Sequence, residues 1–208
     1  MNTKAILFDF DGVIADTEPQ YDLYFNALGK KFGFGEGFAA KIKGVTLPNI
    51  LEKYFAGKSE LWTKIIDETE IFEQNMDFRF IKGAKEFLEY LKKNNYKLAL
   101  VTSSPQGKMD VALEKMNLQN TFDTIVTATQ ITQGKPNPMC YLLAAKNLGV
   151  SPDECVVFED SIAGLQAGRG AGAKVIGLST TLTADVLRNY TEDIIPDFAN
   201  LGKMRLAF

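Results

Sequence analysis

Residues 4–12 of the chain read KAILFDFDG, an apolar run that ends on two aspartates, Asp9 and Asp11. The run is nearly continuous in Ala, Ile, Leu and Phe, which is typical of a strand covered on both faces of a parallel sheet. Carboxylates at the end of such a strand are costly to bury unless positive charge compensates them. The segment therefore predicts a buried strand that ends either in a polar site or in a cap of solvated acids.

Four more runs of this kind follow along the chain, with helix-period apolar patterns between them. The runs span 97–102, 124–128, 154–158 and 174–178, and the helical patterns span 82–94, 106–116, 138–148 and 161–168. Strands that alternate with helices are typical of a doubly wound α/β sheet.

Residues 17–79 break this alternation. They hold no convincing strand, but they contain amphipathic segments at 21–32, 47–55 and 60–75. We predict an inserted helical subdomain at 17–79 and a core formed by 1–16 and 80–208. The three glycines within 33–37 follow no strand, so we interpret them as a loop between helices of the insert and not as a phosphate-binding motif.

The composition excludes several classes of function. The 208 residues include 46% hydrophobic and 24% charged residues, as in an ordinary soluble globular protein. The net charge of −3 shows no basic excess, so we do not expect nucleic acid as a partner. The chain has no histidine, which excludes His-based triads and leaves proton transfer to carboxylates, Lys, Tyr, Cys or water.

The cysteines and the apolar runs point to a compartment. Cys140 and Cys155 lack the spacing of metal ligands, and we expect both to be buried thiols in a reducing environment. No apolar run approaches the ~20 residues of a membrane helix, and Asp9 interrupts the N-terminal run too early for a signal peptide. We therefore expect a cytoplasmic protein with no membrane partner.

Polar residues follow each predicted strand, where open α/β sheets bind their ligands. Thr102, Ser103 and Ser104 follow the second strand and form either an anion site or an ordinary helix cap. Lys135 lies in the loop after the third strand, where a lysine is usually solvated. Glu159 and Asp160 follow the fourth strand and also have the alternative of capping a helix.

Taken together, these residues have a specific chemical use. Carboxylate oxygens at two strand ends suit Mg²⁺, a hard cation that is often held by carboxylates and substrate phosphate. Lys135 and the donors of Thr102 and Ser103 complement the charge of a phosphoryl group. Asp9 is of a residue type that attacks phosphorus covalently, and Asp11 lies on the same side of an extended chain.

The chain resembles the haloacid dehalogenase superfamily, and within it the β-phosphoglucomutase-like phosphatases with a helical cap. The resemblance covers nearly the whole chain and rests on DFDGVIADTE at 9–18, VTSS at 101–104, KP at 135–136 and FEDSIAG at 158–164. It implies a Rossmann-like core with a cap inserted after the first strand, and a phosphoric monoester hydrolase.

The same resemblance implies roles for the residues that match its motifs. Asp9 would be the nucleophile that forms an aspartyl-phosphate, and Asp11 would protonate the leaving oxygen and then deprotonate the attacking water. Thr102 and the backbone N–H of Ser103 would hold phosphoryl oxygens, and Lys135 would neutralise charge between them and the nucleophile.

A metal site is implied as well. Mg²⁺ would be bound by the Asp9 carboxylate, the Asp11 carbonyl and Asp160, with Glu159 in the first or second coordination shell. The presence of Asp11 argues against the dehalogenase reaction, because dehalogenases of the superfamily lack this second aspartate.

The substrate is less defined by the sequence. Leu47 stands where β-phosphoglucomutases carry an arginine, which favours hydrolysis over phosphoryl transfer between two positions of a sugar. Lys43 in the same loop would compensate in part and bind substrate. We predict a monomeric phosphatase acting on a small phosphorylated metabolite, such as a sugar phosphate. The alternatives are a β-phosphoglucomutase, an inorganic pyrophosphatase and, more remotely, a non-catalytic phosphate-binding module.

Overall fold

The computed structural model describes residues 3–43, 45–199 and 201. They divide into two compact units, one formed by residues up to Asp16 and from Phe78 onward, the other by Thr17–Asp77.

The first unit is built on a sheet of parallel strands, which confirms the predicted α/β class. Within the described residues the order is β3-β2-β1-β4-β5-β6. The strands are β1 (Ala5–Phe8), β2 (Lys97–Val101), β3 (Thr124–Val126), β4 (Cys155–Glu159), β5 (Lys174–Leu178) and β6 (Ile194–Ile195). Strand β6 was not predicted from the sequence, because two residues are too few to show a periodicity.

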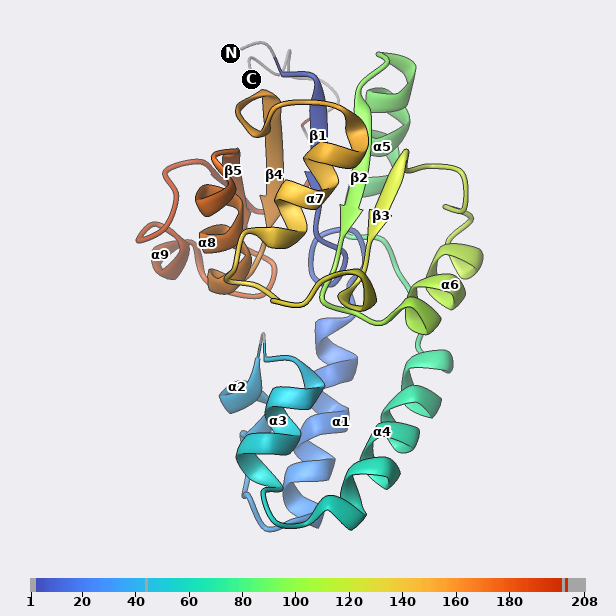
Figure 1. Cartoon of the computed structure of the whole chain (residues 1–208), viewed down its shortest axis with the longest axis vertical. Helices are drawn as coiled ribbons and strands as arrows, with labels where there is room; N and C mark the ends of the chain where they lie inside the picture. Colours follow the sequence, from blue (N-terminus) through green and yellow to red (C-terminus); the bar gives the residue numbers. More distant parts are fainter. Residues whose placement is uncertain (1–2, 44, 200, 202–208) are drawn as a thin grey trace. The chain divides into compact units, whose positions relative to one another are not determined.

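Helices connect these strands. They are α5 (Ala84–Lys93), α6 (Gln106–Lys115), α7 (Met139–Leu148), α8 (Ile162–Ala171) and α9 (Ala184–Leu187), with short 3₁₀ turns η1 (Ala128–Gln130) and η2 (Pro152–Glu154). In Figure 1, α7 and α8 lie in front of the strands, and residues of both helices belong to one core with the sheet.

Alternate side chains of each central strand enter different cores. Leu7 and Val157 belong to the core beneath α7 and α8. Their neighbours Phe8 and Phe158 stack on each other with ring centroids 5.3 Å apart, and Phe87 of α5 packs edge-on against Phe8 at 6.0 Å. Because both faces of the sheet are covered, the strands read as unbroken apolar runs.

The second unit consists of helices α1 (Glu18–Lys31), α2 (Phe38–Ile42), α3 (Leu47–Tyr54) and α4 (Ser59–Gln74). Its core contains Leu28 of α1, Leu51 of α3 and Ile65 of α4. The three glycines of 33–37 lie in the connection between α1 and α2, as predicted, and all three have positive φ. That these residues act as a cap stays a prediction.

Both cysteines are buried free thiols, as the sequence predicted. Cys140 lies on α7 and Cys155 begins β4.

Candidate active site at the carboxyl ends of the strands

The turn after β1 carries both aspartates of the first motif. Because β1 lies between β2 and β4, this turn leaves the sheet near the middle of its carboxyl edge. The backbone N–H of Asp9 donates to the carbonyl of Phe158 at 3.1 Å, and the residue is only 9% exposed. Gly12 reverses the chain with a φ of +72°, a value that glycine adopts without strain. The carboxylate of Asp9 is thus held at the point where the central strands end.

Lys135 reaches this carboxylate from the loop between β3 and α7. Its Nζ lies 2.7 Å from Oδ1 of Asp9 and 2.6 Å from Oε1 of Glu159, and it also donates to the carbonyl of Val101 at 3.1 Å. The side chain of Lys135 is 6% exposed. One buried ammonium therefore forms ion pairs with two buried carboxylates.

This cluster shifts the pKa values of its members. Burial raises the pKa of Asp9 from 3.8 to about 7; the positive charge of Lys135 opposes this shift, and the negative charge of Glu159 adds to it. Burial alone would lower the pKa of Lys135, but Asp9 and Glu159 outweigh it, and the pKa lies above its ordinary value. Lys135 therefore remains a cation, while the charge of Asp9 changes near neutral pH when no metal is bound.

The side chain of Glu159, the last residue of β4, is held by several hydrogen-bond donors. Its Oε1 accepts from the hydroxyl of Tyr141 at 2.7 Å, in addition to Lys135. Its Oε2 accepts from the hydroxyl of Ser161 at 3.1 Å. Gly164 leaves the space for this carboxylate, because a Cβ there would lie 1.8 Å from Oε1. The side chain of Glu159 is completely buried, and its orientation is fixed by these contacts.

Three of the carboxylates are close enough to hold a cation together. Asp9, Glu159 and Asp160 each offer an oxygen, and these atoms lie within 4.8 Å of one another. A Cβ on Gly12 would come within 2.0 Å of Oδ2 of Asp160 and 2.7 Å of Oγ1 of Thr181. Among the described residues, this Thr181 hydroxyl is buried and has no hydrogen-bond partner. Oxygen donors beside an unpaired hydroxyl fit a hard divalent cation and its bound water.

The end of β2 presents the predicted hydroxyl groups. Thr102 is buried, its N–H donates to the carbonyl of Val126 at 2.9 Å, and its Oγ1 accepts from the N–H of Ser104 at 3.0 Å. Ser103 is exposed. Because α6 begins four residues after Thr102, this turn leads into a helix N-terminus, a position suited to an anion.

Lys108, the partner of Asp11, was not predicted from the sequence. Its ammonium lies 2.6 Å from both carboxylate oxygens of Asp11, and the hydroxyl of Ser104 donates to Oδ2 at 2.8 Å. Lys108 shares the buried stripe of α6 with Met109 and Ala112. The sequence carries a signal for the burial of Lys108, which lies on the apolar stripe of a helix that follows a site strand, but no signal that identifies Asp11 as its partner.

Lys43 belongs to the helical unit. Its ammonium lies 3.0 Å from Oε2 of Glu18 and 3.5 Å from Oδ2 of Asp22. Burial acts to lower the pKa of Lys43, but these two carboxylates raise it above its ordinary value. Lys43 is a partnered cation within its unit, and its role in binding substrate stays a prediction.

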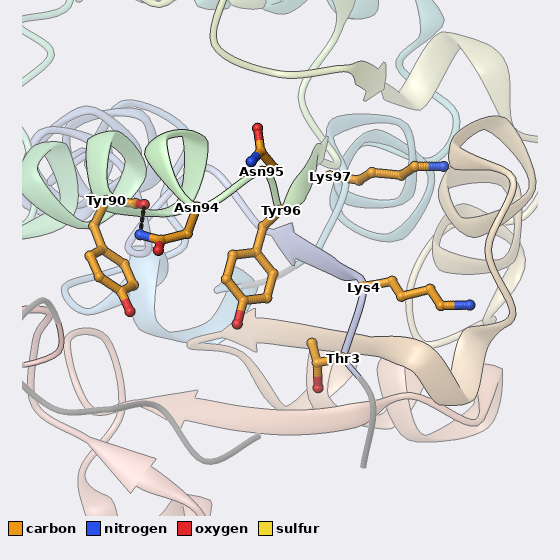
Figure 2. Close-up of a pocket in the computed structure, with 7 residues that line it drawn as sticks. All are labelled: Thr3, Lys4, Tyr90, Asn94, Asn95, Tyr96 and Lys97. Atoms are coloured by element: carbon orange, nitrogen blue, oxygen red, sulfur yellow. Dashed lines mark hydrogen bonds between the residues drawn. The ribbon is translucent and has the colours of Figure 1, made fainter.

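A hollow of about 470 Å³ lies at the amino ends of β1 and β2, the other end of the sheet (Figure 2). Two tyrosines, two asparagines and two lysines are among its lining residues. Both lysines already have partners within the protein: Lys4 forms an ion pair with Glu154 at 2.5 Å, and Lys97 donates to the carbonyl of Leu148 at 2.6 Å. The charged cluster at the carboxyl ends is therefore the stronger candidate for an active site.

Comparisons with known proteins show which family the chain is similar to. The model of the haloacid dehalogenase-like hydrolase family matches residues 6–178. The phosphorylated carbohydrates phosphatase of Thermotoga maritima is 35% identical over 186 residues, which cover 83% of each chain. The β-phosphoglucomutase of Bacillus subtilis is 29% identical over 208 residues, which cover 92% of this chain and 91% of that one.

A solved structure supports the same relationship. A HAD hydrolase, family IA, variant 3, from Entamoeba histolytica superposes with a TM-score of 0.84 at 28% identity, covering 97% of this chain and all of that one. Among the helices that the structure describes, none is long and apolar enough to cross a membrane.

Proposed function

The chain belongs to the haloacid dehalogenase-like hydrolase family and is a phosphoric monoester hydrolase, and from this premise we propose that it releases phosphate from a small phosphorylated carbohydrate. The family and the enzyme class agree with those predicted from the sequence. The observation that carries the proposal is the ammonium of Lys135, which lies within 2.7 Å of Asp9 and of Glu159 at the strand ends.

In the first half-reaction, Asp9 is the nucleophile. One of its carboxylate oxygens forms a bond to phosphorus while the bond from phosphorus to the leaving oxygen breaks. Asp11 donates a proton to that oxygen, so the carbohydrate leaves as an alcohol. Lys135 and the donors of Thr102 and Ser103 stabilise the charge that develops on the phosphoryl oxygens.

In the second half-reaction, Asp11 acts as a base. It takes a proton from a water molecule as the water oxygen forms a bond to phosphorus. The bond between phosphorus and Asp9 then breaks, which releases inorganic phosphate and restores the Asp9 carboxylate. Because Asp11 serves both half-reactions, its loss is expected to be more damaging than the loss of a single proton donor.

The proposal includes a Mg²⁺ ion at the cluster of Asp9, Glu159 and Asp160. When bound, the ion supplies positive charge that aligns the phosphoryl group and offsets its negative charge. Asp9, the carbonyl of Asp11 and Asp160 would hold it. Both oxygens of Glu159 already accept hydrogen bonds from protein groups, which favours a role in orienting Lys135 and the loop.

The substrate class rests on the relatives and on the helical unit. The relative from Thermotoga maritima is named for phosphorylated carbohydrates, which supports such a substrate here. We propose that residues 17–79 cap the site during turnover and that Lys43 contacts the substrate from there. Because another relative is named β-phosphoglucomutase, the mutase reaction is the alternative function.

The test follows two products from one substrate. The purified protein is given β-glucose 1-phosphate in Mg²⁺ with a trace of β-glucose 1,6-bisphosphate, and inorganic phosphate and glucose 6-phosphate are measured together. A panel of sugar phosphates and pyrophosphate runs beside it, with Asp9→Asn as the inactive control. Free phosphate from a sugar phosphate supports the proposal. Rapid glucose 6-phosphate with little free phosphate would establish a mutase, and pyrophosphate as the preferred substrate would establish a pyrophosphatase.

Binding of phosphate without turnover would overturn the proposal that the protein is a phosphatase. In that case, inorganic phosphate would protect the wild-type protein and the Asp9→Asn variant equally against thermal unfolding, while neither released phosphate from any member of the panel.

A further inference from the structure

Lys108 is a charged residue in an apolar position. Its side chain is completely shielded from solvent, on the stripe of α6 that also buries Met109, Ala112 and Leu113. Its ammonium lies 2.6 Å from each carboxylate oxygen of Asp11, 2.9 Å from Oγ of Ser104 and 5.6 Å from the ring centroid of Phe10. The charge of Lys108 is therefore directed at the turn after β1.

Ser104 completes the arrangement. Its hydroxyl donates to Oδ2 of Asp11 at 2.8 Å, and its backbone N–H donates to Oγ1 of Thr102 at 3.0 Å. Oδ1 of Asp11 thus accepts from Lys108, and Oδ2 accepts from both Lys108 and Ser104. These hydrogen bonds from the end of β2 and the first turns of α6 leave the carboxylate little rotational freedom.

Stability alone does not account for a lysine at this position. Removing an ammonium from water is costly, and a buried ion pair is often no more stable than apolar side chains of the same volume. The neighbouring buried residues of α6 show that the helix packs with apolar side chains. The contact that distinguishes Lys108 is its ion pair with Asp11, across 97 residues of sequence.

We propose that Lys108, assisted by Ser104, is a positioning residue for Asp11. It fixes the direction of the Asp11 carboxylate. In the ionised form that these contacts show, Asp11 takes a proton from the attacking water, and the protonated form passes that proton to the leaving oxygen of the next substrate. This inference rests on the proposed function, in which Asp11 transfers both protons. Lys108 itself touches neither substrate nor phosphoryl group in this role.

The test compares two leaving groups in Lys108→Met, Ser104→Ala and a control, Lys115→Met. Lys115 lies on the same helix with an exposed side chain. Alkyl phosphates such as the sugar phosphates need a proton on the leaving oxygen, whereas p-nitrophenyl phosphate loses a stable phenolate without one. We expect Lys108→Met to lower kcat on the sugar phosphate about 10²-fold with little change in KM, as a misplaced catalytic group does.

With p-nitrophenyl phosphate the same variant should give a distinctive time course. The first half-reaction is spared and the second is slowed, so a burst of one p-nitrophenolate per enzyme should precede a slow steady rate. Ser104→Ala should show the same pattern more weakly, and Lys115→Met should match the wild type. Adding Lys108→Met to Asp11→Asn should slow the enzyme no further, because the two side chains act as one unit.

A merely structural role gives a different result. Equal losses on both substrates without a burst, together with a lowered unfolding midpoint, would overturn the positioning role. Should Lys108→Met fail to fold, Ser104→Ala carries the same comparison, and the absence of a differential effect there would overturn it too. Wild-type protein without turnover, or Asp9→Asn protein that retains it, would instead overturn the proposed function.

Discussion

The ammonium of Lys135 lies 2.7 Å from Oδ1 of Asp9, so the side chain proposed as the nucleophile is one partner of a buried ion pair between residues 126 positions apart. The same ammonium lies 2.6 Å from Glu159, and no more than 12% of any of the three side chains is exposed. Without Lys135, two carboxylates would remain in a site with almost no solvent. This arrangement makes Lys135 important for both stability and catalysis.

Replacing Lys135 with methionine is expected to lower kcat by about 10²–10³-fold, because the phosphoryl group loses a preorganised cation. In the metal-free protein at pH 8, the free energy of unfolding should fall by about 3–5 kcal/mol, because one partner of a buried ion pair has been removed. Initial rates and urea unfolding in EDTA measure the two effects. Lys82→Met is the control, since that side chain is 78% exposed and should change neither quantity. Equal unfolding free energies for Lys135→Met and wild type would contradict the buried pair.

The raised pKa of Asp9 predicts how stability depends on pH when no metal is present. Asp9 has a pKa of about 7 in the folded protein and an ordinary value of 3.8. Between these values the folded state binds a proton that the unfolded state does not. The stabilisation from Asp9 is therefore fully present below pH 3.8. It declines by up to about 1.4 kcal/mol per pH unit above that pH, and it is lost once the pH has risen through 7.

Urea unfolding of the EDTA-treated protein between pH 4 and pH 8 measures this slope, with Asp9→Asn as the comparison. Asparagine does not titrate, so the variant should gain stability relative to wild type as the pH rises. The difference should shrink when Mg²⁺ is added, because a bound cation favours the ionised carboxylate. Parallel curves for the two proteins in EDTA would show that Asp9 does not titrate in this range.

The fold was predictable because its strands are buried on both faces. Phe8 and Leu7 point into different cores, and such strands appear in the sequence as unbroken apolar runs. The polar residues that follow these runs indicate the position of the site from the sequence alone, because the carboxyl ends of parallel strands meet at one edge of the sheet. Strand β6 escaped prediction because Ile194–Ile195 is too short to form a pattern.

The contacts that join distant residues were harder to predict. Lys108 reads in sequence as one more helical lysine, and only the tertiary structure shows that it faces Asp11, 97 residues away. The same holds for Tyr141, whose hydroxyl donates to Glu159 at 2.7 Å from a helix face whose other buried residues are Cys, Ala and Leu. Periodicity identifies which face of a helix is buried, but not what that face meets.

Mg²⁺ is expected to stabilise the folded protein against heat. A ligand present at 100 times its dissociation constant adds about 2.7 kcal/mol, which corresponds to a rise in Tm of about 5–10 °C for a chain of this size. Asp160→Asn should abolish the rise, because it removes one carboxylate of the cluster. Asp185→Asn should retain it, since the side chain of Asp185 is 86% exposed and pairs with Arg188.

Activity should follow the same metal dependence. EDTA should remove hydrolysis of a sugar phosphate, and Mg²⁺ should restore it. Full activity in the chelator, or an undiminished thermal shift in Asp160→Asn, would contradict the proposed Mg²⁺ site.

Gly12 offers the sharpest test of how tightly the site is packed. Alanine there would adopt a φ of +72°, and its Cβ would meet Oδ2 of Asp160 at 2.0 Å and Oγ1 of Thr181 at 2.7 Å. Gly172 has a similar φ of +88°, but nothing lies within 4 Å of its Cβ position. Gly172→Ala therefore imposes the same backbone strain, about 1–2 kcal/mol, without crowding any neighbour.

In both variants the free energy of unfolding, measured in urea, is expected to fall by about the energy of this backbone strain. Only Gly12→Ala should also lose the thermal shift with Mg²⁺ and about 10²-fold in kcat, because Asp160 must move away from the other carboxylates. Gly172→Ala should keep the metal response and the rate of the wild type. If Gly12→Ala behaved like Gly172→Ala in both assays, the space beside Asp160 would have no part in binding the metal, and the cluster of Asp9, Glu159 and Asp160 would need another explanation.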